Sequence, residues 1–286
     1  MLNRISIIFM LLCMFVLSSL YCEDIRVMTF NIRYNNAGDG INTWQNRKEL
    51  VADMIRFHQA DVVGLQEALY GQIEDLVALL PEYDWIGVGR YDGKLEGEFS
   101  AIFYLKDRFE MLNNSTFWLS ETPDVPGLGW DAVCYRIVTW GEFQDKTSGK
   151  IFYHFNTHFD HKGETARKES AILLLNSVAV IAGDAAVIVT GDFNAHPDSV
   201  PYQIITQGWD GKKLIDSQFI SLYPHHGPTG TFTGFDFAKL AKPLELIDYI
   251  FVNEKISVIL HGTLSDTYDG KLPSDHFPVL AEIKIN

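Results

Sequence analysis

Cysteine and basic residues are scarce in this sequence. Three cysteines occur in 286 residues, and only Cys134 lies well inside the chain. An internal disulfide framework is therefore excluded, and the fold must depend on its packed core. The 23 Lys and Arg are outnumbered by 37 Asp and Glu, for a formal charge of −14. Such an acidic chain, without a long basic stretch, disfavours duplex nucleic acid as a substrate.

Long apolar runs are missing except at the N-terminus, where residues 5–20 follow Arg4. This run is short for a bilayer span, so we interpret residues 1–22 as a signal peptide of an exported, secreted or periplasmic protein. An uncleaved anchor or a lipoprotein modified at Cys22 are the alternatives. The mature chain, residues 23–286, would carry a charge of −15, because removal takes away one Arg and no acid. We expect it to have no stable membrane span.

One large domain over residues 23–286 fits a length and hydrophobic content sufficient for a substantial core. Alternating and β-branched apolar runs predict strands, and apolar residues at helical spacing predict helices. The strands are expected at Ile25–Ile32, Val62–Gln66, Trp85–Gly89, Ser100–Leu105, Arg136–Gln144, Lys150–Thr157, Val187–Thr190, Ile247–Val252 and Val279–Ile285, and the helices at Arg47–Phe57, Gln72–Leu80 and Glu164–Ile181. This mixture indicates an α/β fold with a mixed sheet or two sheets packed face to face.

Polar residues recur where the apolar strands begin or end. They are Asn31, Glu67, His158, Asp192 with Asn194, Asp248, and the pair Asp275 and His276. Carboxylates and imidazoles at one sheet edge would supply oxygen ligands for Mg²⁺ or Mn²⁺, a base for water, and a cation for phosphoryl charge. Each residue alone also fits a turn, a helix cap or a structural histidine. Six such sites in one chain favour the chemical interpretation.

The ordered motifs resemble those of the endonuclease/exonuclease/phosphatase superfamily, which includes deoxyribonuclease I. The motifs are Thr29-Phe30-Asn31, Gln66-Glu67, Asn156-Thr157-His158, Gly191-Asp192-Phe193-Asn194, Ile247-Asp248-Tyr249 and Ser274-Asp275-His276. The resemblance spans residues 29–280 and implies a two-sheet, four-layer α/β sandwich.

The resemblance also implies a site for Mg²⁺ or Mn²⁺. Glu67 would be the principal metal ligand, Asn31 would lie beside the metal and the phosphate, and Asp275 would assist. One-metal and two-metal schemes both remain open.

Five further residues take catalytic roles by the same resemblance. Asp192 would orient or deprotonate the attacking water, and Asn194 would hold a phosphate oxygen. His276, positioned by Asp248, would stabilise the charge that builds on phosphorus. His158 would contact the phosphate or the leaving oxygen.

Segments between the motifs resemble a mainly bacterial, frequently exported branch of the superfamily. These segments are residues 117–123, 129–131, 136–140 and 229–232. Arg136 is a candidate phosphate clamp, and Arg47 and Arg33 are further candidates for substrate binding. For these two arginines, a solvated or salt-bridged position is the alternative.

The sequence therefore predicts an exported, metal-dependent hydrolase of a phosphodiester or phosphomonoester, acting by in-line attack of water. A small phosphate ester is the expected substrate, and a monomer is expected. One alternative is a secreted nuclease that acts on DNA or RNA. The other is a non-catalytic module that binds a phosphate ligand, although such a module would normally have lost Glu67, Asp192, Asp248 or His276, and all four are present.

Overall fold

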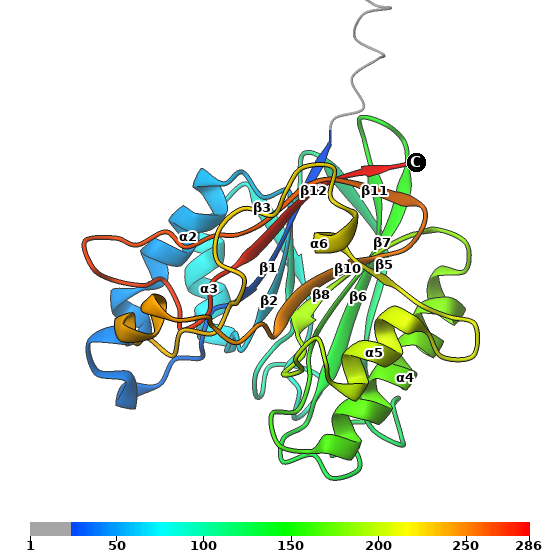
Figure 1. Ribbon diagram of the computed structural model, residues 1–286, viewed down its shortest axis with the longest axis horizontal. Helices are drawn as coiled ribbons and strands as arrows, with labels where there is room; N and C mark the ends of the chain where they lie inside the picture. The colour runs from blue at the N-terminus through cyan, green and yellow to red at the C-terminus, as the bar shows by residue number, and fades with distance from the viewer. Residues whose placement is uncertain (1–23) are drawn as a thin grey trace, which may run out of the picture.

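The computed structural model describes residues 24–286. The predicted signal peptide, residues 1–22, and the start of the domain at residue 23 lie outside the described residues. Two six-stranded sheets form the centre of the described chain, and helices cover their outer faces (Figure 1). The predicted four-layer sandwich is therefore confirmed.

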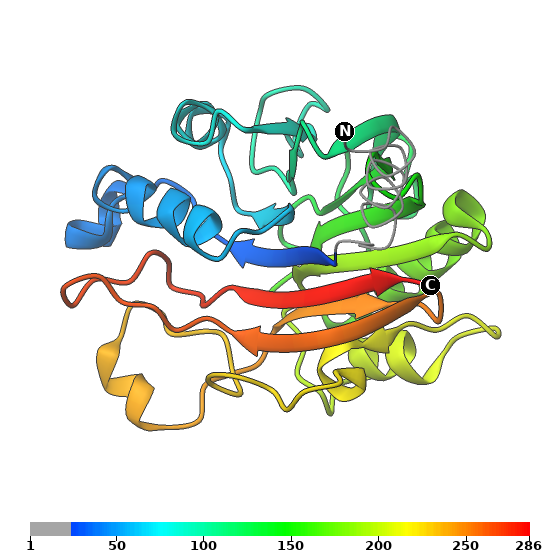
Figure 2. The same ribbon diagram turned by 90° about the horizontal axis from the view of Figure 1, so that it is seen from above.

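The first sheet has the strand order β11-β12-β1-β2-β4-β3. Its strands are β1 (Ile25–Asn31), β2 (Val62–Gln66), β3 (Tyr83–Ile86), β4 (Ile102–Leu105), β11 (Ile256–Thr263) and β12 (Val279–Ile285). Figure 2 shows β12 running between β1 and β11. Only β1 and β2 pair in parallel, and the other neighbours are antiparallel.

The second sheet has the order β5-β6-β7-β8-β10-β9. Its strands are β5 (Phe109–Trp118), β6 (Ile137–Asp145), β7 (Ile151–His158), β8 (Ala186–Asp192), β9 (Ile215–Asp216) and β10 (Asp248–Val252). Here β7 and β8 are the parallel pair. Each sheet thus contains one parallel pair, whose two strands end at the same edge.

The helices α2 (Lys48–Phe57) and α3 (Tyr70–Leu79) lie on the first sheet, and α4 (Glu164–Ala182) and α5 (Val200–Gln207) lie on the second (Figure 1). Shorter helices are α6 (Ser217–Ile220) and the 3₁₀ segments η1 (Ala37–Asn42), η2 (Trp44–Asn46) and η3 (Phe237–Ala241). Within residues 24–286, no helix has the length and apolar character needed to cross a bilayer.

Successive side chains of each strand point to opposite faces of its sheet, and this alternation explains how the sheets and helices form layers. In β1, Met28 and Phe30 pack toward α2 and α3, whereas Val27 faces the second sheet. In β8, Val189 packs toward α4 and α5, and Ile188 faces the first sheet. Because successive side chains point to opposite faces, each central strand contributes to two of the three cores.

The inter-sheet layer changes from apolar to polar along the strands. Beyond the apolar residues, the same face carries Gln66 and Asn156, and Gln66 Nε2 donates to Asn156 Oδ1 at 2.7 Å. Asn156 Oδ1 also accepts from Thr190 Oγ1 at 3.0 Å. Gly64 makes room for this network, because a Cβ there would lie 2.1 Å from Thr190 Oγ1. Polar groups are therefore buried and paired immediately below the sheet edge.

Two of the strands that the sequence analysis missed, β5 and β11, are sheet edges. The centre of β5, residues 113–115, is Asn-Asn-Ser and is exposed, so it lacks the apolar alternation of a strand. An edge strand is bonded on one side only, and solvent tolerates polar residues there. The short strand β9 and helix α5 were also not predicted.

Candidate active site

The predicted site residues meet at one edge of the sandwich. Asn31 ends β1, Glu67 directly follows β2, and His158 and Asp192 end β7 and β8. Asp248 begins β10, which runs antiparallel to β8. In the second sheet, Asp192 pairs with both His158 and Asp248, so these three residues lie side by side on adjacent strands.

Asn31 links the two sheets at this edge. Its Nδ2 donates to Glu67 Oε1 at 3.1 Å and to Asp192 Oδ2 at 3.0 Å. Ser274 Oγ donates to the Asn31 carbonyl at 2.6 Å, which fixes the segment before β12 against β1. Since Asn31 is fully buried, this amide holds the two carboxylates at a defined separation.

Three residues of the site have left-handed backbone conformations. The φ angles are 58° for Arg33, 62° for Glu67 and 45° for Asn194. Positive φ is uncommon for residues other than glycine and costs of order 1–3 kcal/mol, so surrounding contacts must enforce it. Each of the three residues follows a strand, and the sharp turn directs the chain across the edge of the sheet.

Asp248 and His276 form a buried ion pair. Nδ1 of His276 donates to Asp248 Oδ2 at 2.8 Å, and Thr231 Oγ1 donates to the same oxygen. Burial alone would lower the pKa of His276, but Asp248 raises it well above the usual value, with smaller contributions from Asp192 and Asp275. The imidazole is therefore protonated at neutral pH, and its Nε2–H lies 3.8 Å from Asp192 Oδ2.

Asp192 is a candidate base. Burial and the neighbouring Asp248 raise its pKa to about 7, although His276 and two hydrogen bonds favour the ionised form. Those hydrogen bonds come from the Asn194 backbone N–H, at 2.9 Å, and from Asn31. A carboxylate with a pKa near neutrality is suited to accepting a proton from water.

His158 and Asn194 lie on either side of Asp192. His158 Nε2 is 3.5 Å from Asp192 Oδ2, and burial together with Arg136 and Arg90 lowers the pKa of His158 well below its usual value. A neutral imidazole can donate one hydrogen bond without carrying charge. The Asn194 carboxamide donates to the Phe159 carbonyl at 3.0 Å and retains a second N–H.

Glu67 and Asp275 provide a negatively charged position beside this group. Arg33 lies 3.9 Å from each carboxylate, but its guanidinium is already paired with Asp39 through two bonds of 3.0 Å. Burial raises the pKa of Asp275, while the positive charge of His276 lowers it and the negative charge of Glu67 raises it. A small cation beside the two carboxylates would favour their ionised forms.

The donor set fits a hard divalent ion such as Mg²⁺ or Mn²⁺. Glu67 and Asp275 offer carboxylate oxygens, the preferred ligands of these ions. The Asn31 amide oxygen instead accepts the Arg33 N–H at 3.0 Å, so Asn31 orients Glu67 through its nitrogen.

A second compact group consists of Asp192, Asp248 and His276, whose candidate ligand atoms all lie within 4.8 Å of one another. Asp248 and His276 already satisfy each other by a hydrogen bond. We therefore interpret this group as a proton-handling cluster, which leaves Glu67 and Asp275 as the carboxylates that could hold a cation.

Arg136 and Arg90 form a cationic wall beside His158. Both are buried, with 5% and 6% of their surface exposed, and Arg136 Nε and Nη1 and Arg90 Nε have no hydrogen-bond partner. Arg90 pairs with Glu98 at 2.7 Å. Arg90 and Glu98 were not predicted from the sequence. The signal available for both was their place in the glycine-containing stretch of residues 90–99 between two predicted strands.

Arg47 is not positioned to bind substrate. Its guanidinium is 1% exposed and donates to the carbonyls of Ile32 at 2.9 Å and Pro273 at 2.7 Å, with a further bond to Asn42. Burial lowers its pKa to about 10, so it remains protonated at neutral pH. Arg47 thus ties together the chain segments after β1 and before His276, and we correct its role from substrate contact to positioning.

We expect Arg47→Met to lower the free energy of unfolding by about 3 kcal/mol, because several buried carbonyls lose their donor. Arg26→Met is a matched control, since the Arg26 side chain is 38% exposed and pairs with Glu282 at the surface. Its cost should be about 1 kcal/mol or less. Urea unfolding of both variants measures the difference, and equal losses would contradict the positioning role of Arg47.

A cavity of about 520 Å³ opens among these groups. Its walls include Arg33, Glu67, Arg90, Glu98, Arg136, His158, Asp192, Asn194, Phe232, Asp275 and His276. Another cavity, of about 560 Å³, lies near Arg26 at the opposite end of β1. There Arg26 and Arg108 pair with Glu282 and Asp61, so that cavity lacks a comparable group of catalytic side chains. We call the 520 Å³ cavity the cleft.

Comparisons with known proteins agree with this arrangement. The model of the endonuclease/exonuclease/phosphatase family matches residues 28–276. A family protein from Bacteroides vulgatus is 44% identical, with a TM-score of 0.88 over 92% of this chain and 100% of that one. A mannosyl-6-phosphatase from Bacteroides thetaiotaomicron is 39% identical, with a TM-score of 0.85 over 91% of this chain and 100% of that one.

Among curated relatives, an uncharacterised mimivirus protein is 31% identical over 180 residues, which are 59% of this chain and 66% of that protein. The chain thus spans less than two thirds of the length of the curated relatives it first matches.

Proposed function

Because the chain belongs to the endonuclease/exonuclease/phosphatase family, we propose that it is an exported, divalent-metal-dependent hydrolase of small phosphate esters. Phosphomonoesters of sugar-like alcohols are the preferred class in this proposal. The observation that carries it is the cleft itself, where Asp192 and the ion-paired His276 adjoin the oxygen donors Glu67 and Asp275.

Each catalytic residue of the cleft has a separate role in hydrolysis. Asp192 accepts a proton from the attacking water, which forms the new P–O bond as the bond between phosphorus and the alcohol oxygen breaks. The departing alkoxide takes up a proton from solvent, and Asp192 later releases its proton to solvent. His276, kept protonated by Asp248, donates its Nε2–H toward the phosphoryl oxygens as negative charge develops. The free N–H of Asn194 and the neutral His158 complete the set of donors around the phosphate.

A divalent cation held by Glu67 and Asp275 would neutralise the charge of the phosphate, which otherwise repels the nucleophile. Arg33 lies on the same side, 3.9 Å from each of the two carboxylates.

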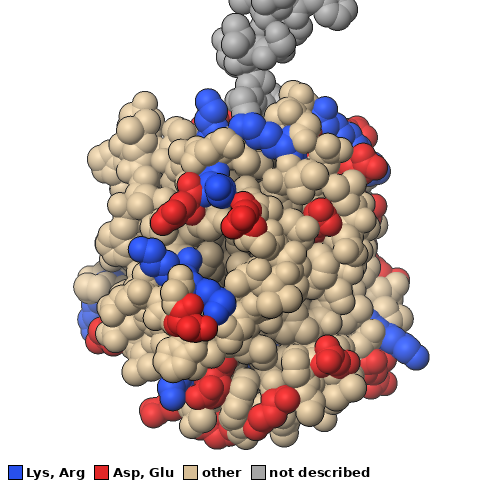
Figure 3. All heavy atoms as spheres, turned by 90° about the vertical axis from the view of Figure 1, so that its right-hand side faces the viewer, with Lys and Arg blue, Asp and Glu red and all other residues tan. Residues whose placement is uncertain are grey.

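The cationic wall supports a small, highly charged ester. Arg90 and Arg136 line the cleft, although each also pairs with a carboxylate, Glu98 and Asp160 respectively. A phosphomonoester carries more charge to pair with them than a diester does. The similarity to a sugar phosphatase over the whole of that chain favours the same class. Lys and Arg alternate with Asp and Glu on the face shown in Figure 3, which has no continuous basic band for a long polyanion.

Metal dependence is the most direct test. EDTA should reduce hydrolysis of p-nitrophenyl phosphate to background, and added Mg²⁺ or Mn²⁺ should restore it. Addition of Ca²⁺ to the metal-free enzyme is the control for a purely structural effect of charge. Ca²⁺ binds oxygen ligands at longer distances and in a less regular geometry than Mg²⁺ does. Full turnover in the chelated enzyme would end the proposed mechanism.

A substrate panel tests the ester class. With Mg²⁺ present, kcat/KM for mannose 6-phosphate should exceed that for bis-p-nitrophenyl phosphate and for a single-stranded oligonucleotide. Activity highest on the oligonucleotide and falling steeply with salt would instead identify a nuclease. Tight binding of phosphate esters without turnover would identify a non-catalytic module.

Export rests on the apolar run of residues 5–20. Expression of the full chain in a bacterium, followed by N-terminal sequencing of the periplasmic fraction, tests it. A mature N-terminus near residue 23 is expected, and an intact chain in the cytosol would contradict export.

A further inference from the structure

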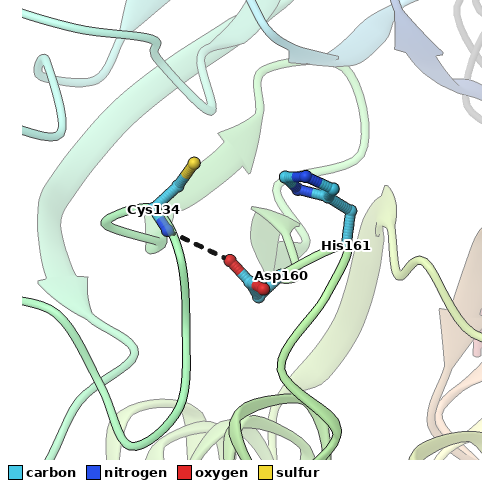
Figure 4. A group of neighbouring side chains, drawn as sticks. All are labelled: Cys134, Asp160 and His161. Carbon is cyan, nitrogen blue, oxygen red and sulfur yellow. Dashed lines mark hydrogen bonds between the residues drawn. The ribbon is translucent and has the colours of Figure 1, made fainter.

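A thiol, an imidazole and a carboxylate meet at the rim of the cleft, outside the catalytic group. Cys134, Asp160 and His161 offer candidate ligand atoms that all lie within 4.8 Å of one another. Figure 4 shows the Cys134 sulfur and the His161 ring on the same side of the two loops, with Asp160 below them. Cys134 and His161 also line the cleft. None of the three has a role in the proposed hydrolysis.

Asp160 fixes the positions of the other two residues. Its Oδ2 accepts the backbone N–H groups of Val133 and Cys134, at 3.1 and 3.2 Å. Its Oδ1 accepts those of Lys162 and Gly163, at 2.9 and 2.8 Å. One buried carboxylate thus joins the loop before β6 to the loop after β7. The thiol and the imidazole are therefore brought together by the fold before any ligand binds.

The donor types differ from those at Glu67 and Asp275. Thiolate and imidazole are soft or borderline ligands that select Zn²⁺ and Co²⁺ over Mg²⁺. In tetrahedral zinc sites, the sulfur and nitrogen ligand atoms lie roughly 3.3–3.7 Å apart. Side-chain rotations that move the ligand atoms by about 1 Å therefore suffice. Cys134 is a free thiol.

We propose that Cys134 and His161 form a second metal site, for a soft divalent cation of the zinc class, at the rim of the cleft. Asp160 has its oxygen lone pairs engaged by four N–H groups and already pairs with Arg136, whose Nε lies 3.5 Å from Asp160 Oδ2. The Cys134 thiolate would offset one of the two charges of the ion. With only two side chains as ligands, fewer than the three of an open catalytic zinc site, the ion would need water or an ester oxygen to complete its coordination.

The site is coupled to the cationic wall through one hydrogen bond. Arg136 Nη2 donates to His161 Nδ1 at 3.1 Å. A neutral imidazole has one nitrogen lone pair, so a metal bound at either nitrogen removes this acceptor from Arg136.

The test is a titration of the full-length, reduced protein with Co²⁺ in the presence of saturating Mg²⁺. Thiolate ligation gives a ligand-to-metal charge-transfer band in the near ultraviolet, which oxygen ligands do not give. We expect the band to saturate at one equivalent and to disappear when Zn²⁺ is added. Cys134→Ser should abolish the band, and His161→Gln should weaken Co²⁺ binding about 10-fold or more.

His196→Gln is the matched control, because His196 is exposed and lies outside the cluster. It should bind Co²⁺ as the parent protein does. A band that persists in Cys134→Ser, or no band in the parent protein, would overturn the proposal. If Cys134→Ser does not fold, alkylation of Cys134 by N-ethylmaleimide, mapped by mass spectrometry, replaces it. Zn²⁺ should slow that alkylation about 10-fold, and an unchanged rate would overturn the proposal. None of these readouts requires hydrolysis, so they are independent of the proposed activity.

Discussion

Replacing His276 by alanine is expected to lower kcat/KM for a small phosphate ester by about 10² to 10⁴-fold. The imidazole is 5% exposed, is kept protonated by Asp248, and lies 3.8 Å from Asp192. Its loss removes a positive charge in a site that excludes most water, where such charges act most strongly. The measurement is steady-state kinetics with Mg²⁺ present.

His261→Ala is the matched control for burial. His261 is also 5% exposed and is hydrogen-bonded to His225, but it lies on β11 outside the cleft. It should unfold at a lower temperature while retaining most of its turnover. Comparable loss of activity in both folded variants would show that His276 acts only through stability.

The variant Asp248→Asn tests whether Asp248 acts by keeping His276 protonated. The substitution keeps the side-chain volume but removes the charge that raises the pKa of His276. His276 would then lose its proton at a lower pH, so the basic limb of the kcat/KM profile should move to lower pH. An unmoved limb would show that Asp248 does not control the protonation of His276.

Asp192→Asn is expected to have a similarly large effect, about 10² to 10⁴-fold in kcat/KM. The amide cannot accept the proton of water, and its nitrogen would face the Nδ2 donor of Asn31, which now bonds to Asp192 at 3.0 Å. Asp216→Asn is the control, because Asp216 is also buried, with 4% exposed and a pKa raised by burial. That variant should lose stability and keep its turnover.

In the parent enzyme, kcat/KM should fall toward acidic pH, and the Asp192 group should control this acidic limb of the profile. Burial and Asp248 raise its pKa to about 7 without metal, and the ionised form is the active base, so activity falls as the pH drops through this value. A cation at Glu67 and Asp275 favours the ionised form, and the limb should therefore move to lower pH as Mg²⁺ is raised. Because the group is coupled to Asp248 and His276, the limb belongs to the cluster as a whole. A limb that is independent of Mg²⁺ would contradict this placement of the cation.

Much of the fold could be predicted from local apolar runs. The strands within residues 25–32, 62–66 and 279–285 are buried almost throughout, since each central strand packs against one core on either face. The edge strand β5 escaped prediction, because its exposed polar centre lacks apolar alternation. The strand β11 was also missed, although it is mostly buried. The signal peptide remains a prediction.

The positions of Asn31, Glu67, His158, Asp192 and Asp248 at strand ends could be predicted from the apolar runs beside them. Parallel strands end at the same edge, and Asp248 reaches that edge because β10 begins there and runs antiparallel to β8. The directions and partners of the arginines depend on the tertiary structure. Arg47 is enclosed by backbone carbonyls, whereas Arg90 and Arg136 form one wall of the cleft. The tertiary structure also brought Cys134 next to His161, 27 positions along the chain, through the hydrogen bonds of Asp160. This difference arises from the distance between a side chain's functional group and the backbone that positions it. A strand end is fixed by backbone pairing, but the direction of a long or loop-borne side chain depends on partners that are distant in sequence.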